Sequence, residues 1–154
     1  MRNLVTTTLV AAALAVVTGC AAPAASSGAR SYEPHTMNVL LGASFNRPDT
    51  GVAVGANYEY RKEDKLGFGA FADVAFADEV TTVLGGAVYW HPVDRWTVFG
   101  GPGVMFGDGD TDVIARVGGS YTIPLKKWTI APTGWVDIGE EVALFIGAAL
   151  VLHF

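Results

Sequence analysis

The sequence contains a single cysteine, Cys20, so no disulfide can form within the chain. Charged residues are also scarce: they make up 16% of the 154 residues, against about 25% in a typical soluble domain. Beyond the N-terminal segment there is no run of about 18 apolar residues, which excludes a membrane-spanning helix from that part of the chain. Because 51% of the residues are hydrophobic, the apolar surface must be spread over shorter segments.

Basic residues are fewer than acidic residues, 10 against 15. Only Arg2 is charged before Cys20, so the chain from Cys20 onward carries nine bases and 15 acids, a net charge of −6. A nucleic-acid-binding domain is expected to carry an excess of positive charge. We therefore expect no nucleic-acid partner.

The N-terminal segment has the features of an export signal. Arg2 supplies a short positive region, and residues 4–17 supply an apolar core. Residues 17–20, Val-Thr-Gly-Cys, resemble the lipobox of bacterial lipoproteins. This resemblance implies a signal peptide over residues 1–19, followed by lipidation of Cys20 as the first mature residue.

Ordinary signal-peptidase cleavage, for example after Ala24 or Ala29, is the alternative, and it would discard the cysteine. Residues 20–35 are small and polar, include proline and serine, and show no periodicity. Such a composition predicts a flexible tether. The remaining segment, residues 36–154, is predicted to form one folded domain.

Residues 37–154 repeat one pattern eight times: about ten residues alternate between bulky apolar and small or polar side chains. This period of two predicts β-strands. Short polar turns separate the strands at 47–50, 62–65, 78–79, 91–94, 107–111, 124–127 and 139–141. An even number of strands, with one apolar face and one glycine-rich polar face, predicts an all-β fold. We expect an eight-stranded antiparallel up-and-down transmembrane β-barrel with short turns.

Two prolines, Pro102 and Pro132, fall in the middle of predicted strands. Proline lacks the N–H group that a strand ladder uses, and it is normally found at sheet edges or bulges. A closed barrel has no edge, so we expect β-bulges at both positions.

The eight alternating strands and the terminal Phe154 resemble small outer-membrane β-barrels of the OmpA/OmpX type. The last strand, which ends Leu-Val-Leu-His-Phe at residues 150–154, looks like the C-terminal signal that the barrel-assembly machinery reads. The resemblance covers residues 37–154 and implies contact with outer-membrane lipid and lipopolysaccharide. It also implies a periplasmic tether and C-terminus. Two features depart from the family: the extracellular turns are unusually short, and a lipobox is uncommon on a barrel.

Aromatic residues and charges are divided between the two ends of the predicted barrel. The end that holds the tether carries the denser aromatic belt: Tyr58, Tyr60, Phe68, Trp90, Trp96, Tyr121, Trp128 and Phe154. Aromatic belts lie at the depth of lipid headgroups. The turns at the other end, together with the adjacent Asp112, contain eight acids and one base, Arg47, whereas the turns at the tether end are mixed to basic.

An eight-stranded barrel has an interior just wide enough for side chains to fill. The inward positions include Glu59, Asp73, Arg116 and Asp137, and buried charges need partners. We predict that Arg116 bridges Asp73 and Asp137 in a polar network that plugs the lumen. The predicted role is non-catalytic, either structural or in envelope interactions. A narrow channel for small amphipathic solutes, as in OmpW-like proteins, is the alternative.

Asp108, Asp110 and Asp112 are spaced two residues apart, like the start of a calcium loop. Such a loop needs glycine at its sixth position and glutamate at its twelfth, where this chain has Val113 and Gly119. We interpret the segment as an acidic turn. Weak binding of a divalent cation, bridging to lipopolysaccharide phosphates, is the alternative, and we expect no resident metal or cofactor.

Two further functions, a lipid-A-modifying hydrolase and a soluble lipocalin-like carrier, agree less well with the positions of the histidines and of the apolar faces. A lipid-A-modifying hydrolase would need a histidine beside a serine near the outer leaflet, but His35, His91 and His153 all map to the periplasmic end. We therefore expect no catalytic residue. A soluble lipocalin-like carrier would need its apolar face inside, which would force three of the tryptophans into the lumen.

Overall fold

A computed structural model describes residues 34–46, 49–107 and 109–154 of the chain. The described part contains strands and turns only. No helix within it is long and apolar enough to cross a membrane. The strands are β1 (His35–Asn46), β2 (Asp49–Glu63), β3 (Leu66–Phe76), β4 (Val80–Val93), β5 (Trp96–Gly107), β6 (Asp110–Tyr121), β7 (Ile123–Pro124), β8 (Thr129–Ile138) and β9 (Val142–His153).

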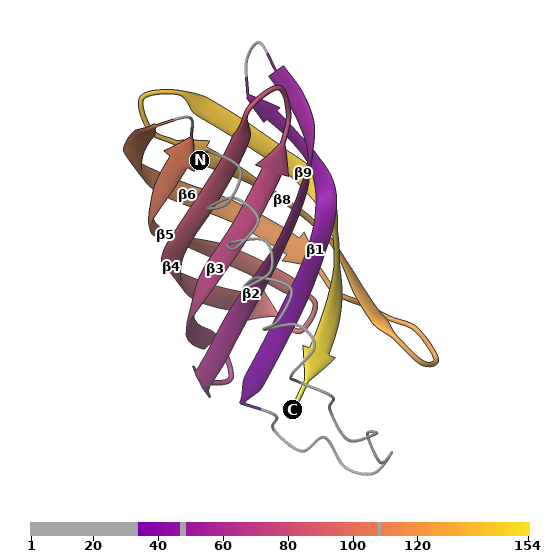
Figure 1. The fold of residues 1–154 in the computed structure, drawn as a ribbon. Coiled ribbons are helices and arrows are strands. Elements are labelled where there is room, and N and C mark those ends of the chain that lie inside the picture. The colour runs from indigo at the N-terminus through magenta and orange to yellow at the C-terminus, as the bar shows by residue number, and fades with distance from the viewer. Residues whose placement is uncertain (1–33, 47–48, 108) are drawn as a thin grey trace.

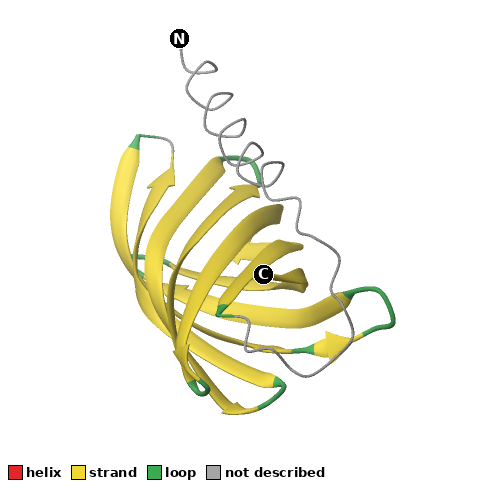
Figure 2. Ribbon diagram, turned by 90° about the horizontal axis from the view of Figure 1, so that it is seen from below, coloured by secondary structure: helices red, strands yellow, loops and turns green. Residues whose placement is uncertain are grey.

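The strands form one closed antiparallel barrel, which confirms the predicted fold class. Each strand pairs with the next, β1 pairs with β9, and the additional pairing of β6 with β8 closes the wall. The wall has eight strands, because β7 contains two residues and pairs only with the start of β8. Figures 1 and 2 show the strands tilted and wrapped around a common axis.

The two ends of the barrel differ in what they carry. β1 begins and β9 ends at the same end, near the bottom of Figure 1, and we call this the terminal end. There the backbone N–H of Phe154 donates to the carbonyl of His35 at 3.2 Å, and that of Arg61 donates to the carbonyl of Pro34 at 2.7 Å. The opposite end holds the acidic turns and is called the turn end.

The hairpin between β6 and β8 differs from the sequence expectation of one strand that continues to Ile123. The strand breaks at Thr122, whose N–H donates to the carbonyl of Arg95 at 2.8 Å. Pairing with β8 resumes at Ile123, where β7 begins. Pro124 then ends β7, since proline has no N–H to continue a ladder.

The expectation of bulges at Pro102 and Pro132 was wrong. Pro102 pairs with Ala115 and Pro132 pairs with Ala148, with no register shift at either position. Each proline removes only one donor, and the ladders on both sides of it hold the register. The register shifts instead lie beside turns at the terminal end, between Arg61 and Glu63 on β2 and between Trp90 and Val93 on β4.

The interior is filled by placing aromatic rings against glycines. A Cβ at Gly118 would lie 2.7 Å from Cζ of Phe99, and a Cβ at Gly147 would lie 2.7 Å from Cζ of Phe145. Any larger residue at these glycines would displace a buried ring. The exterior is apolar instead: tryptophans at the terminal end, such as Trp96, are about half exposed.

Candidate functional site

Arg116 on β6 is the centre of an ionic cluster inside the barrel, and it is 1% exposed. Its Nε and Nη2 donate to the two carboxylate oxygens of Asp137 on β8 at 2.6 and 2.7 Å. Its Nη1 and Nη2 donate to those of Asp73 on β3 at 2.5 and 3.1 Å. Both carboxylates are therefore held by two hydrogen bonds each, the geometry that makes arginine–carboxylate pairs strong and specific.

Aromatic rings enclose the Arg116 guanidinium. Its Cζ lies 4.1 Å from the ring centroid of Phe71 and 4.4 Å from that of Trp135. The Trp135 indole N–H donates to Asp137 at 3.3 Å, and its ring stacks on Phe145 with centroids 3.7 Å apart. We call Arg116, Asp73, Asp137, Phe71 and Trp135 the arginine cluster. Cation–π contacts and ion pairs together fix the guanidinium in a water-poor environment.

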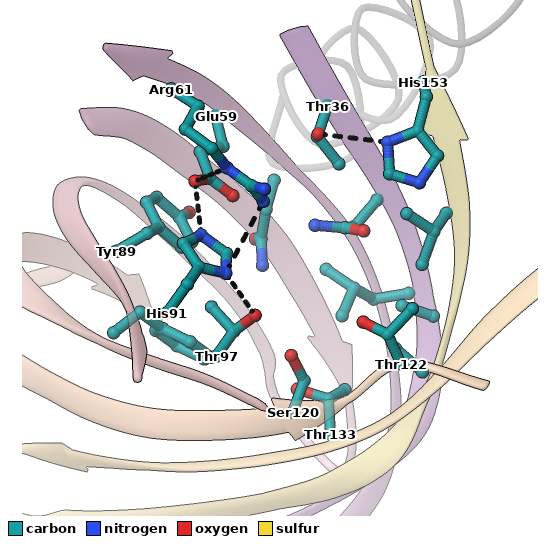
Figure 3. Close-up of a pocket in the computed structure, with 17 residues that line it drawn as sticks. Thr36, Glu59, Arg61, Tyr89, His91, Thr97, Ser120, Thr122, Thr133 and His153 are labelled. Carbon is teal, nitrogen blue, oxygen red and sulfur yellow. Dashed lines mark hydrogen bonds and ion pairs between the residues drawn. The ribbon is translucent and has the colours of Figure 1, made fainter. Parts of the chain in front are cut away.

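A second cluster lies nearer the terminal end, where Glu59 on β2 is hydrogen-bonded to His91 on β4. Nε2 of His91 lies 2.7 Å from Oε1 of Glu59, and Nδ1 lies 3.1 Å from the hydroxyl of Thr97 on β5. Arg61 donates a hydrogen bond to Glu59 and another to Nδ1 of His91, each at 3.5 Å. We call these four residues the histidine cluster, and Figure 3 shows them converging from three strands.

Glu59 reaches His91 by crossing the intervening strand β3 at Gly67. A Cβ at Gly67 would lie 2.8 Å from both Cγ and Cδ of Glu59. A guanidinium can only donate hydrogen bonds, so the contact with Arg61 makes Nδ1 of His91 an acceptor and leaves the ring proton on Nε2. His91 then donates to Glu59, which is 3% exposed.

A cavity of about 40 Å³ lies beside the histidine cluster. Hydroxyl and amide side chains line it, and Figure 3 shows several of them pointing toward its centre. Two residues that line it each hold a buried polar atom that has no hydrogen-bond partner within the described protein: Oδ1 of Asn57 and the hydroxyl oxygen of Tyr89. The cavity spans Thr36 to Leu40 on β1, which is about 13 Å at 3.3 Å per residue.

The predicted polar network divides into two parts in the structure. Arg116, Asp73 and Asp137 come together, whereas Glu59 lies in the histidine cluster with different partners. The sequence expectation placed His91 in a turn, but β4 continues through it and its side chain points inward. The alternation along the sequence did indicate this inward position of His91. It is two residues after Tyr89, so the two side chains lie on the same, inward face of β4.

Of four other predicted positions, the structure describes two. Asp110 begins β6 and Asp112 follows on the same strand at the turn end, while Asp108 lies outside the described residues. Among the described residues, no group of three side chains could hold a metal ion. Cys20 also lies outside the described residues, so its lipidation stays a prediction.

No protein-family model matches the sequence, and no curated protein matches it either. Solved structures do share the fold. A de novo designed transmembrane β-barrel is 16% identical, with a TM-score of 0.61, over 79% of this chain and 98% of that chain. The N-terminal β-barrel domain of Pseudomonas aeruginosa OprF is 9% identical, with a TM-score of 0.59, over 78% and 98% of the two chains. The designed barrel TMB2.3 is 14% identical, with a TM-score of 0.53, over 80% and 98%. The chain is therefore similar in fold to transmembrane barrels of outer-membrane type.

Proposed function

We propose that this protein is an integral outer-membrane β-barrel with a non-catalytic role, structural or in envelope interactions, and with a lumen closed to solutes. The observation that carries the closed lumen is the arginine cluster. Arg116 binds carboxylates on two other strands, and the rings of Phe71 and Trp135 lie against its guanidinium. Because an eight-stranded barrel has little interior space beyond its side chains, a cluster of this size blocks passage.

The distribution of polarity supports a membrane location. Buried charges lie inside the wall, while large apolar side chains such as Leu84 and Val117 are exposed on the outside. In water such an exterior would be a continuous apolar patch, but in lipid it is the favoured surface. The aromatic belt at the terminal end and the acids at the turn end favour an orientation with the terminal end in the periplasm.

A catalytic role is the weaker candidate. Glu59, His91 and Thr97 have the residue types of a nucleophilic triad. However, the cavity beside them measures about 40 Å³, which holds about three water molecules. It leaves no room for an acyl substrate, so we assign these residues to hydrogen bonding within the lumen.

The membrane proposal can be tested with protein extracted from membranes. We expect heat-modifiable migration on gels, and retention in the membrane after alkaline carbonate treatment. Release by carbonate together with unchanged migration on boiling would contradict the barrel in the membrane. Planar bilayers then test the closed lumen: we expect no steady conductance from the native chain, and stable single-channel steps would support the channel alternative instead.

The lipid anchor and the assembly route belong to the same proposal. We propose that residues 1–19 are removed, that Cys20 is acylated, and that the residues between Cys20 and the start of β1 at His35 tether the barrel. Mass spectrometry of the mature protein should find the acylated N-terminus at Cys20, and Cys20→Ala should abolish it. A mature chain that begins after Ala24 or Ala29 would contradict lipidation. We also propose that Phe154 is read by the barrel-assembly machinery and that the exterior contacts lipopolysaccharide.

A further inference from the structure

The hairpin of β7 and β8, residues 123–130, projects from the terminal end of the barrel. Among the described strands β7 pairs only with β8, because the ladder between β5 and β6 ends at the pair of Trp96 with Tyr121. Figures 1 and 2 both show the hairpin extending to the side of the barrel, at the right of each view. Its turn is closed by the backbone N–H of Leu125, which donates to the carbonyl of Trp128 at 2.7 Å. The hairpin is therefore an arm that β8 joins to the wall, and we call residues 125–128 its tip.

One face of the hairpin is apolar. Ile123 pairs with Ile130, and two residues further toward the turn Leu125 lies opposite Trp128. Residues two apart on a strand share a face, and so do residues directly opposite on neighbouring strands. These four side chains therefore lie together on the outside of the barrel, since Ile130 precedes the inward-facing Ala131. Leu125 is 52% exposed and Trp128 is 59% exposed, so this face is open to its surroundings at the tip.

The tip of the hairpin also carries positive charge. Lys126 and Lys127 are the two exposed residues between Leu125 and Trp128. The other turns at this end balance their bases with acids: residues 62–65 contain two lysines, one glutamate and one aspartate, and residues 94–95 are an aspartate and an arginine. Residues 123–130 contain two lysines and no acid, a net charge of +2, on a chain whose net charge is −5. The hairpin is therefore suited to a negatively charged partner.

We propose that this hairpin binds the headgroups of anionic phospholipids in the leaflet at the terminal end, an inference that rests on the proposed membrane location. The Trp128 and Leu125 side chains enter the headgroup region, where tryptophan is favoured because its ring is amphipathic. The lysine ammonium groups contact lipid phosphates, and without neighbouring acids they select a lipid of net negative charge over a zwitterionic one. The sideways projection of the hairpin puts its tip over the surrounding lipid. The apolar face favours lipid over an acidic protein, because it continues the outer surface of the wall.

NMR of the full-length protein in phospholipid nanodiscs tests this proposal. The discs contain phosphatidylcholine and an increasing fraction of phosphatidylglycerol. We expect the signals of the Trp128 indole N–H and the Lys127 amide to shift saturably with the phosphatidylglycerol fraction. The double variant Lys126→Gln with Lys127→Gln should weaken this response about thirtyfold, because each lysine near an anionic surface contributes about fivefold. Raising the salt from about 0.1 M to about 1 M should also weaken it, since the screening length falls from about 10 Å to about 3 Å.

Lys62→Gln with Lys65→Gln is the matched control. It removes the same charge from exposed positions in another turn at the same end of the barrel. Because acids balance these two lysines, we expect the half-saturating fraction of phosphatidylglycerol to stay unchanged. A lipid that carries a nitroxide at its headgroup should broaden the Trp128 indole signal, and a soluble gadolinium chelate should broaden it less, because the ring lies in the headgroup region.

Equal responses of the two double variants would overturn the proposal. An equal response to inorganic phosphate in discs of phosphatidylcholine alone would also overturn it, because the lysines would then bind free anions. Broadening of the Trp128 signal by the gadolinium chelate and not by the nitroxide lipid would place the tip in water, as an arm for an acidic protein, and would overturn it as well. Cross-peaks from lipid acyl chains to the Leu84 and Val117 methyl groups report the membrane location separately. If they are present and the hairpin does not respond, this inference alone fails, whereas their absence contradicts the proposed function.

Discussion

Replacing Arg116 with alanine is the most direct test of how the lumen is stabilised. The substitution removes four hydrogen bonds that Arg116 donates to two carboxylates. Asp73 and Asp137, which are 7% and 5% exposed in the native protein, then remain buried without a cation. Breaking a buried ion pair by removing one partner typically costs about 3–5 kcal/mol. We therefore expect the free energy of unfolding to fall by about that amount, measured by urea unfolding in lipid vesicles with tryptophan fluorescence.

Two comparisons separate charge from packing in this experiment. Arg95→Ala removes an exposed arginine at a turn and should change stability by less than about 0.5 kcal/mol. A triple variant, Arg116→Gln with Asp73→Asn and Asp137→Asn, removes all three buried charges and should recover most of the loss. An unchanged unfolding midpoint in Arg116→Ala would refute the reasoning. A triple variant as unstable as the single variant would show that lost packing, and not unpaired charge, caused the loss.

The remaining predictions concern packing inside the wall, and the same unfolding assay measures them. Gly67→Ala places a methyl group against Glu59 and should destabilise the barrel by about 1–3 kcal/mol, whereas Gly86→Ala, whose Cβ would lie 3.7 Å from its nearest neighbour, should change little. Equal stability of the two variants would contradict the placement of the Glu59 side chain across β3 at Gly67. Trp135→Ala should cost about 3–5 kcal/mol because the indole is buried, and a loss no larger than that of the exposed Trp128→Ala would contradict its role in the core.

The architecture could be predicted because alternation in the sequence maps directly onto the two faces of each strand. A shift of one residue would move every apolar side chain to the other face, so the pattern fixes which residues point inward. By that rule, Arg116, Asp73 and Asp137 fall at inward-facing positions of their strands. Their contact also depends on strand register, and the short turns between neighbouring strands constrain the register.

The features that the sequence did not reveal depend on pairing between strands. His91 lies beside Pro92 and Asp94, which are typical turn residues, yet β4 continues to Val93 because it pairs with β5. The register shift between Trp90 and Val93 accompanies this extension and places His91 beside Thr97. Local residue preferences cannot specify such a contact, because it is formed by residues of the partner strand.

The two halves of the lumen hold separate hydrogen-bonded clusters, the arginine cluster and the histidine cluster, with Phe99 between them. A path through the barrel would require both the displacement of aromatic rings such as Phe99 and Trp135 and the breaking of the Arg116 ion pairs. The cavity is reached from the terminal end without either change, because Phe99 lies between it and the arginine cluster. A variant such as Arg116→Ala can therefore affect conductance while the cavity keeps its polar lining. Conversely, Tyr89→Phe removes a buried hydroxyl and leaves every hydrogen bond of Arg116 in place.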